Sequence, residues 1–135
     1  MDEKALSVSR WLIKAGNDFL TAETMLAASQ PTPDTICFHA QQCAEKCLKA
    51  FLVWHDQDFE KIHDLVRLLE FCLPIDPTFE TLRETAILLT DYAVEARYPD
   101  DWREIPLAEA QEAVMHARQF ADFVRSKIDL GDATA

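Results

Sequence analysis

Glycine is almost missing from this 135-residue chain, which contains only Gly16 and Gly131. Phosphate-binding loops of the P-loop and dinucleotide-binding types need several glycines, because backbone N–H groups must come close to the phosphates. Neither type of loop can be built from this sequence. The scarcity also argues against a β-rich fold, since tight hairpins normally place glycine in their turns.

Basic residues are also few, because 13 lysines and arginines stand against 24 aspartates and glutamates, for a net charge of −11 at pH 7. Binding to nucleic acid is driven by clustered lysine and arginine, so we do not expect an extended nucleic-acid surface. A small local basic pocket is still compatible with this charge.

Long apolar runs are absent, and no stretch approaches the length of a membrane-spanning helix. The first residues lack the basic region and apolar core of a signal peptide. We therefore expect a cytoplasmic protein with no membrane association. In that compartment the four cysteines are expected to be reduced core residues rather than disulfides.

Apolar residues recur three and four positions apart in five segments, the pattern of amphipathic helices. We predict helices over residues 2–28, from 34 or 35 to 54 or 55, over 63–71, over 77–97 and from 106 to about 128. The expected N-caps are Asp34 or Thr35 for the second helix and Asp76, followed by Pro77, for the fourth. Pro99 should end the fourth helix, because it disfavours helical geometry at the preceding residue.

These helices predict one all-α domain over residues 1–130 with a frayed tail at 131–135. Its expected fold is an antiparallel up-down four-helix bundle with one additional short helix. Several apolar residues lie off the main stripes, and a small bundle cannot bury them all: Trp11, Ile13, Leu20, Phe38, Val53, Ile87, Leu88, Phe120 and Phe123. They predict a second apolar surface, and hence a homodimer or a helical partner.

Three stretches occur in a distinctive order: "FHAQQCAEKCLKAFLVWH" at 38–55, "KIHDLVRLLEFC" at 61–72 and "IDPTFETLRETAILLTDYAVEARYPD" at 75–100. Together they resemble the HEPN family (higher eukaryotes and prokaryotes nucleotide-binding), from the first helix to about residue 128. The resemblance implies a helical bundle that usually dimerises. It also implies a minimal nucleotidyltransferase as partner, often in a toxin–antitoxin system.

Many HEPN proteins are metal-independent ribonucleases, whose motif is an arginine followed after four to six residues by a histidine. Arg97 stands where the resemblance places that arginine. The positions expected to offer the histidine hold Trp102, Arg103 and Glu104. The tyrosine of a related variant is also missing, so the chain lacks the complete ribonuclease motif.

The stretch "EARYPDDWRE", residues 95–104, is the first candidate ligand site. Arg97 could hold a phosphate bidentately, Tyr98 or Trp102 could stack on a base, and Arg103 adds a second guanidinium. In a dimer, two copies could line one cleft. The alternative is a helix-ending loop in which Arg97 pairs with a nearby carboxylate, that of Glu95, Asp100 or Asp101.

A polar stripe on the second helix is the second candidate, formed by His39, Gln42, Lys46 and Lys49 at helical spacing. It could be a phosphate-binding edge that faces the turn between the fourth and fifth helices. The alternative is a solvated helix face on which Glu45 supports Lys49.

His63 could act as a general base. The alternative is a structural role at the start of the short helix, where Asp64 favours the helix dipole.

His39, Cys43 and Cys47 have residue types that zinc accepts, spaced four residues apart. Both cysteines lie inside the apolar stripe of the second helix, where free cysteine behaves as a small buried hydrophobe. We therefore predict core packing, with no metal and no cofactor.

Three functions remain open from the sequence. The first is a HEPN-type module that binds nucleotide or RNA near Arg97 and pairs with a nucleotidyltransferase. The second is an endoribonuclease with a substituted site, in which Arg97 stabilises developing charge and His39 or His63 transfers protons. The third is a structural interaction domain whose turn performs no chemistry.

Overall fold

The computed structural model describes residues 2–59, 61–93 and 103–130 and is entirely helical over them, apart from the connecting turns. The α-helices are α1 (Glu3–Leu26), α2 (Pro33–Trp54), α3 (Leu65–Cys72), α4 (Arg83–Thr90) and α5 (Leu107–Ser126). Two 3₁₀ segments, η1 (Pro77–Leu82) and η2 (Asp91–Ala93), flank α4. The predicted all-α bundle with an additional short helix is confirmed.

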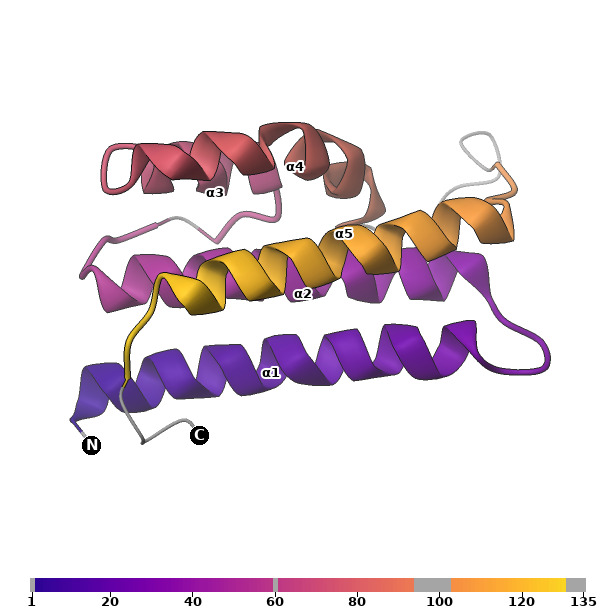
Figure 1. Ribbon diagram of the computed structural model, residues 1–135, viewed down its shortest axis with the longest axis horizontal. Helices are drawn as coiled ribbons and strands as arrows, with labels where there is room; N and C mark the ends of the chain where they lie inside the picture. Colours follow the sequence, from indigo (N-terminus) through magenta and orange to yellow (C-terminus); the bar gives the residue numbers. More distant parts are fainter. Residues whose placement is uncertain (1, 60, 94–102, 131–135) are drawn as a thin grey trace.

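The three long helices lie side by side, and α3 and α4 form a shorter layer over one side of α2 (Figure 1). Helices α1 and α2 run in opposite directions, as do α4 and α5 (Figure 1). This is the up-down order expected from short connections. The start of α5 lies at the opposite end of the bundle from the start of α1 (Figure 1).

Capping side chains set the N-termini of several helices. Asp2 caps α1 by accepting from the Ala5 N–H at 2.7 Å, and Asp76, a predicted cap, holds η1 by accepting from the Thr78 N–H at 3.0 Å. Each carboxylate satisfies a backbone donor that has no partner within the helix.

Two predicted helix starts are wrong. Helix α2 begins at Pro33 with Thr32 as N-cap, before the predicted caps, because proline is favoured at the first helical position. Helix α3 begins at Leu65, and Asp64 is its N-cap, so His63 precedes the helix.

The fourth helix is not the single long α-helix that was predicted. Residues 77–82 are 3₁₀, the α-helix covers only Arg83–Thr90, and a 3₁₀ turn follows. Tighter 3₁₀ turns are frequent at the ends of α-helices. The predicted remainder, residues 94–97, lies outside the described residues.

Helix α2 forms the centre of the core, with most of its side chains buried. Phe51 packs on Phe79 of η1 at 4.4 Å between ring centroids, which ties the α3–α4 layer to the long helices. Phe120 is fully buried, so its predicted place off the core was wrong. It lies three residues after Ala117 and four before Val124, which puts it on the same helical face as these two buried residues.

Other apolar side chains do remain at the surface, as predicted. Ile13 and Leu20 of α1 and Ile87 and Leu88 of α4 are each more than half exposed. None of the described helices combines the length and the apolarity needed to cross a bilayer.

Candidate functional site at the junction of α4 and α5

The candidate stretch at 95–104 falls where the chain passes from α4 to α5. Arg97, Tyr98 and Trp102 lie outside the described residues, whereas Arg103 is described. Among the described elements, η2 precedes this stretch in the sequence and α5 follows it.

Arg103 is held by the first turn of α5. Its guanidinium donates two hydrogen bonds to Glu109, with N–O distances of 3.1 and 2.6 Å. The hydroxyl of Tyr92 donates to the same carboxylate. A carboxylate in the first turn of a helix is also favoured by the helix dipole. Arg103, Tyr92 and Glu109 therefore form one connected cluster.

Proton affinities in this cluster follow from its contacts. The hydrogen bonds from Arg103 hold the pKa of Glu109 below its ordinary value, and the Glu109 carboxylate raises the pKa of Arg103. Burial raises the pKa of Tyr92, and the hydrogen bond to Glu109 raises it further. The cluster is thus a neutral phenol and an ion pair at neutral pH.

An open crevice of about 380 Å³ lies between α4 and α5 beside this cluster. Its walls include Tyr92, Arg103 and Glu109, the exposed Ile87 and Leu88, and His116. The sequence indicated no partner for His116. Its spacing of seven residues from Glu109 was the available signal, because residues seven apart share a helical face.

The polar stripe of α2 is engaged in ion pairs with neighbouring elements. His39 Nδ1 lies 2.8 Å from Asp18 Oδ1, and Lys46 donates to the other oxygen of Asp18. Asp18 is only 8% exposed. It was missed in the sequence, although it lies in the apolar row between Ala15 and Ala22.

A second carboxylate, that of Glu45, is contacted by Lys49 of the stripe and by side chains outside it. Lys49 donates to it at 3.0 Å, His63 Nδ1 lies 3.0 Å from it, and Gln41 donates to it at 3.2 Å. Gln42 in turn donates to the Gln41 side-chain oxygen at 2.7 Å. The expected Glu45–Lys49 pair is present, but both side chains are almost completely buried rather than solvated.

The histidines considered for proton transfer are therefore held by carboxylates of α1 and α2. His39 faces Asp18 and His63 faces Glu45, and neither lines the crevice at the junction. Among the described residues that line this crevice, His116 is the imidazole.

All four cysteines are buried as free thiols, in agreement with the prediction of core packing. Burial raises the pKa of both Cys37 and Cys72 to about 12. A hydrogen bond with Cys47, together with burial, raises the pKa of Cys43. Over the described part of the chain, no group of three potential ligands is arranged to hold a metal ion.

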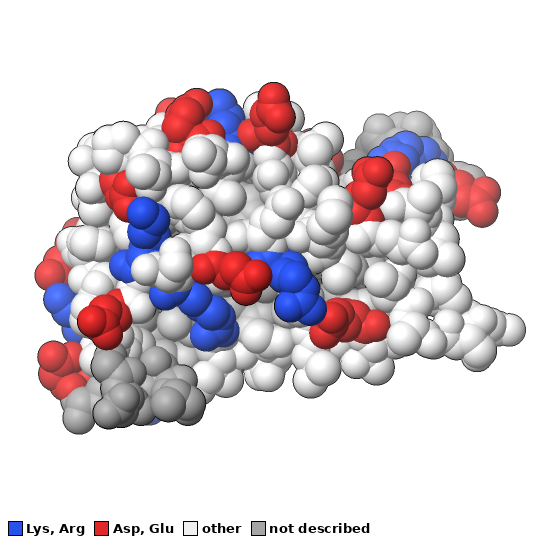
Figure 2. Space-filling model, viewed as in Figure 1, with Lys and Arg blue, Asp and Glu red and all other residues white. Residues whose placement is uncertain are grey.

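Acidic and basic side chains alternate on the face formed by α1 and α5 rather than gathering by sign (Figure 2). On this face, the basic side chains do not form a broad patch (Figure 2).

Comparisons with known proteins found one family model and solved structures that are similar to this chain. Residues 8–127 match the model of the HEPN domain. The structure is similar to the crystal structure of TT1696 from Thermus thermophilus, with a TM-score of 0.75 and 32% identity, over 90% of this chain and 98% of that one. It is also similar to ST0689, an archaeal HEPN homologue, with a TM-score of 0.70 and 24% identity, over 89% of this chain and 96% of that one. No curated protein sequence matches the chain.

Proposed function

The chain belongs to the HEPN domain family, and from this we propose that it is a nucleotide- or RNA-binding module whose ligand contacts the junction of α4 and α5. The crevice beside Arg103 carries the proposal. Its described lining includes a guanidinium, a phenol, an imidazole and exposed apolar side chains, from elements that flank in the sequence the stretch that contains Arg97. Single-stranded nucleic acid is bound by such a combination of positive charge and flat side chains.

Arg97 is assigned the anion-binding role at this junction. Arg103 is paired with Glu109, so it supplies less free positive charge than the sequence suggested. The ligand therefore depends on Arg97 for its main phosphate contact, with Tyr98 and Trp102 as the stacking candidates. His39, Gln42, Lys46 and Lys49 are assigned a structural role, because ion pairs and hydrogen bonds already occupy them.

The test is RNA binding by the purified protein, beside Arg97→Ala and Arg10→Ala. Arg10 is an exposed arginine of α1 and serves as the matched control. We expect Arg97→Ala to weaken binding by about tenfold, the effect of losing one charge-assisted contact, and Arg10→Ala to leave it unchanged. Equal weakening by both variants would mean that only the total charge matters.

The proposal includes two protein contacts. A homodimer is proposed through Ile87 and Leu88, which are 55% and 56% exposed on the wall of the crevice, so that two junctions lie side by side. Replacing both by Asp should give a monomer in light scattering, whereas Ile13→Asp on α1 should not. A dimer that survives the double replacement would place the interface elsewhere.

The second proposed contact is a minimal nucleotidyltransferase, within a cytoplasmic toxin–antitoxin-like pair. Co-expression with a small nucleotidyltransferase encoded by the adjacent gene should yield a stable complex. An unrelated neighbouring gene, with no complex on co-expression, would contradict this partner.

A ribonuclease with a substituted site is the second candidate function, because His116 lines the same crevice as Arg103. In this mechanism Arg97 stabilises the developing charge and His116 transfers a proton. Cleavage would then be lost in His116→Ala but retained in His63→Ala. Loss in His63→Ala alone would instead favour the histidine that the sequence suggested.

A further inference from the structure

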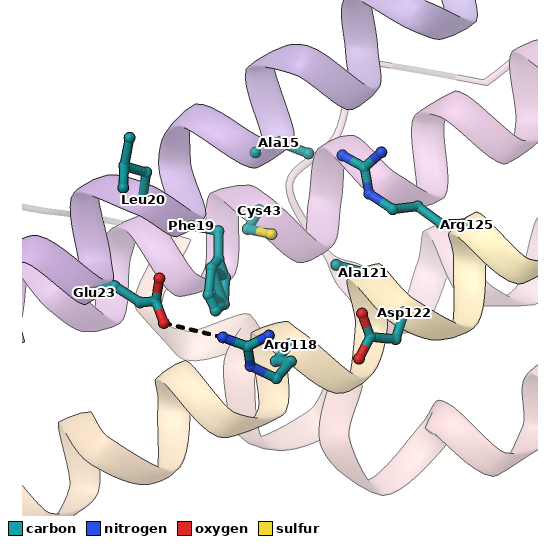
Figure 3. Close-up of a pocket in the computed structure, with 10 residues that line it drawn as sticks. Ala15, Phe19, Leu20, Glu23, Cys43, Arg118, Ala121, Asp122 and Arg125 are labelled. Carbon is teal, nitrogen blue, oxygen red and sulfur yellow. Dashed lines mark hydrogen bonds and ion pairs between the residues drawn. The ribbon is translucent and has the colours of Figure 1, made fainter. Parts of the chain in front are cut away.

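A second crevice lies on the opposite side of α5, between this helix and α1 (Figure 3). Its residues on α5 are Arg118, Ala121, Asp122 and Arg125, whereas the junction crevice uses Glu109, Glu112, Ala113 and His116. With 3.6 residues per turn, the two sets fall on opposite faces of the helix. The second crevice has a volume of about 250 Å³.

Arginines bridge the two helices at both ends of this crevice. Arg118 donates to Glu23 of α1 at 3.0 Å, and its guanidinium lies 4.8 Å from the ring centroid of Phe19. Arg125 donates to the Leu12 carbonyl oxygen at 3.0 Å. A guanidinium carries five N–H donors, so this bond leaves Arg125 with donor capacity for a ligand. Between the two arginines, the crevice is lined by small residues, Ala15, Gly16 and Ala121.

Gly16 lies at the crevice although the packing of this chain does not require glycine there. It occupies the middle of α1, where glycine destabilises a helix relative to alanine. A Cβ at this position would meet only the Arg125 guanidinium, at 3.7 Å, which is ordinary van der Waals contact. The missing methyl group instead keeps space open beside Arg125. Glycine is one of the residues by which a backbone lets a ligand approach closely.

The charges that line the crevice are balanced in number, with the guanidinium groups of Arg118 and Arg125 and the carboxylates of Glu23 and Asp122. Glu23 is paired with Arg118, whereas Arg125 points toward α1 and away from Asp122 (Figure 3). Such a site does not suit a bare polyanion. It suits a ligand that brings both an anionic group and N–H donors. The floor is formed by the buried, neutral thiol of Cys43, and Phe19 offers a flat apolar face.

We propose that the crevice between α1 and α5 is a binding site for one nucleoside monophosphate with an amino-bearing base. The base lies against Phe19 and donates its amino group to Glu23 or Asp122, and the phosphate binds Arg125. Arg118 and Arg125 are seven residues apart, about 10 Å along α5, which separates the base end from the phosphate end. The volume of about 250 Å³ lies below the usual range of about 300–1,000 Å³ for ligand pockets, so a bound nucleotide keeps part of its surface outside the crevice.

The first test is calorimetric titration of the purified protein with AMP, CMP, UMP, adenosine and inorganic phosphate. AMP and CMP should bind about tenfold more tightly than UMP, because uracil has no amino group to donate. Adenosine and phosphate should each bind more weakly than AMP, since each fills one end only. Equal binding of UMP and CMP, or binding of phosphate as tight as that of AMP, would overturn the proposal.

The variant Gly16→Ala separates binding from folding. Alanine should raise the melting temperature, because it favours the helix, and should weaken AMP binding by about tenfold as the methyl group fills the space beside Arg125. Arg125→Gln should weaken all nucleotides alike. A more stable Gly16→Ala protein that binds AMP as before would overturn the assignment.

The proposal does not depend on the junction of α4 and α5, and one control distinguishes the two sites. Arg103→Gln, at the junction crevice before the start of α5, should leave AMP binding unchanged. If Arg103→Gln abolishes AMP binding while Arg125→Gln does not, the nucleotide binds at the junction and this site is wrong. If Gly16→Ala instead alters a concentration-dependent association of the chain, the crevice receives a protein side chain and not a nucleotide.

Discussion

Arg103 and Glu109 form a two-bond ion pair across the start of α5, with N–O distances of 3.1 and 2.6 Å. The pair fixes one guanidinium of the junction in place and neutralises it. An anionic ligand at this crevice must therefore compete with Glu109 for Arg103. Arg103 therefore adds little free positive charge to this crevice, whose described lining also includes the carboxylates of Asp91 and Glu112.

Removing the carboxylate should strengthen nucleic-acid binding at the junction. In Glu109→Gln, Arg103 is released to contact a phosphate, so RNA should bind more tightly and the salt dependence should steepen by about 0.7 in log–log slope, as for one added single-strand contact. Binding isotherms at several salt concentrations measure this. Glu112→Gln makes the same charge change in the same crevice at a carboxylate other than the one that holds Arg103. Identical effects from both variants would show that net charge, not release of Arg103, is responsible.

Tyr92 should report on the same cluster. The chain has two tyrosines, so a Tyr98→Phe background leaves Tyr92 as the only phenol to titrate. In that background, adding Glu109→Gln should lower the Tyr92 pKa toward its ordinary value of 10.0, although burial continues to raise it. Ultraviolet absorbance against pH measures the shift. An unchanged Tyr92 pKa would mean that the hydroxyl does not interact with Glu109 in solution.

Acid should weaken the same ion pair. Because the folded-state pKa of Glu109 is held below its ordinary value of 4.5, its contribution to stability is full above pH 4.5 and is lost as the pH falls through the folded-state pKa. The difference in unfolding free energy between the native chain and Glu109→Gln should therefore shrink between about pH 6 and pH 3. Denaturant unfolding at each pH gives the comparison. A difference that grows as the pH falls would contradict this sign.

Asp18 is expected to stabilise the bundle rather than take part in binding. Asp18→Asn removes the charge that holds both His39 and Lys46, and should lower the free energy of unfolding by about 2 kcal/mol, allowing for the partial exposure of its partners. Asp58→Asn, an exposed position, should cost less than about 0.5 kcal/mol. RNA binding should be unchanged in both. Loss of binding in folded Asp18→Asn would return the α2 stripe to the candidate ligand sites.

Local signals in the sequence predicted much of the fold. Asp76 was predictable as an N-cap because capping depends on hydrogen bonds between residues close in the sequence. The all-helical class was predictable from the spacing of the apolar residues. The start of α2 was misplaced because Asp34 and Thr35 are residue types that favour the N-cap, whereas Pro33 occupies the first helical position. The burial of Phe120 could have been predicted from its spacing, because it shares a helical face with Ala117 and Val124.

The candidate site was less predictable because its contacts join distant residues. Asp18 and His39 are 21 positions apart in the sequence. The helical spacing of His39 and Lys46 on α2 therefore did not indicate that both contact Asp18 of α1. Arg103 and Tyr92 both donate hydrogen bonds to Glu109 of α5. The number of arginines in the sequence therefore overestimated the positive charge available to a ligand at this site. His116 gained significance only once α4 had been placed beside α5.

The most direct test of the account is RNA binding and cleavage measured together, in chelator, for the native chain and for Arg97→Ala. The account predicts that the native chain binds RNA without cleaving it, and that Arg97→Ala binds about tenfold more weakly. Cleavage by the native chain that disappears in Arg97→Ala would contradict it, and would make this HEPN protein a ribonuclease without the motif histidine.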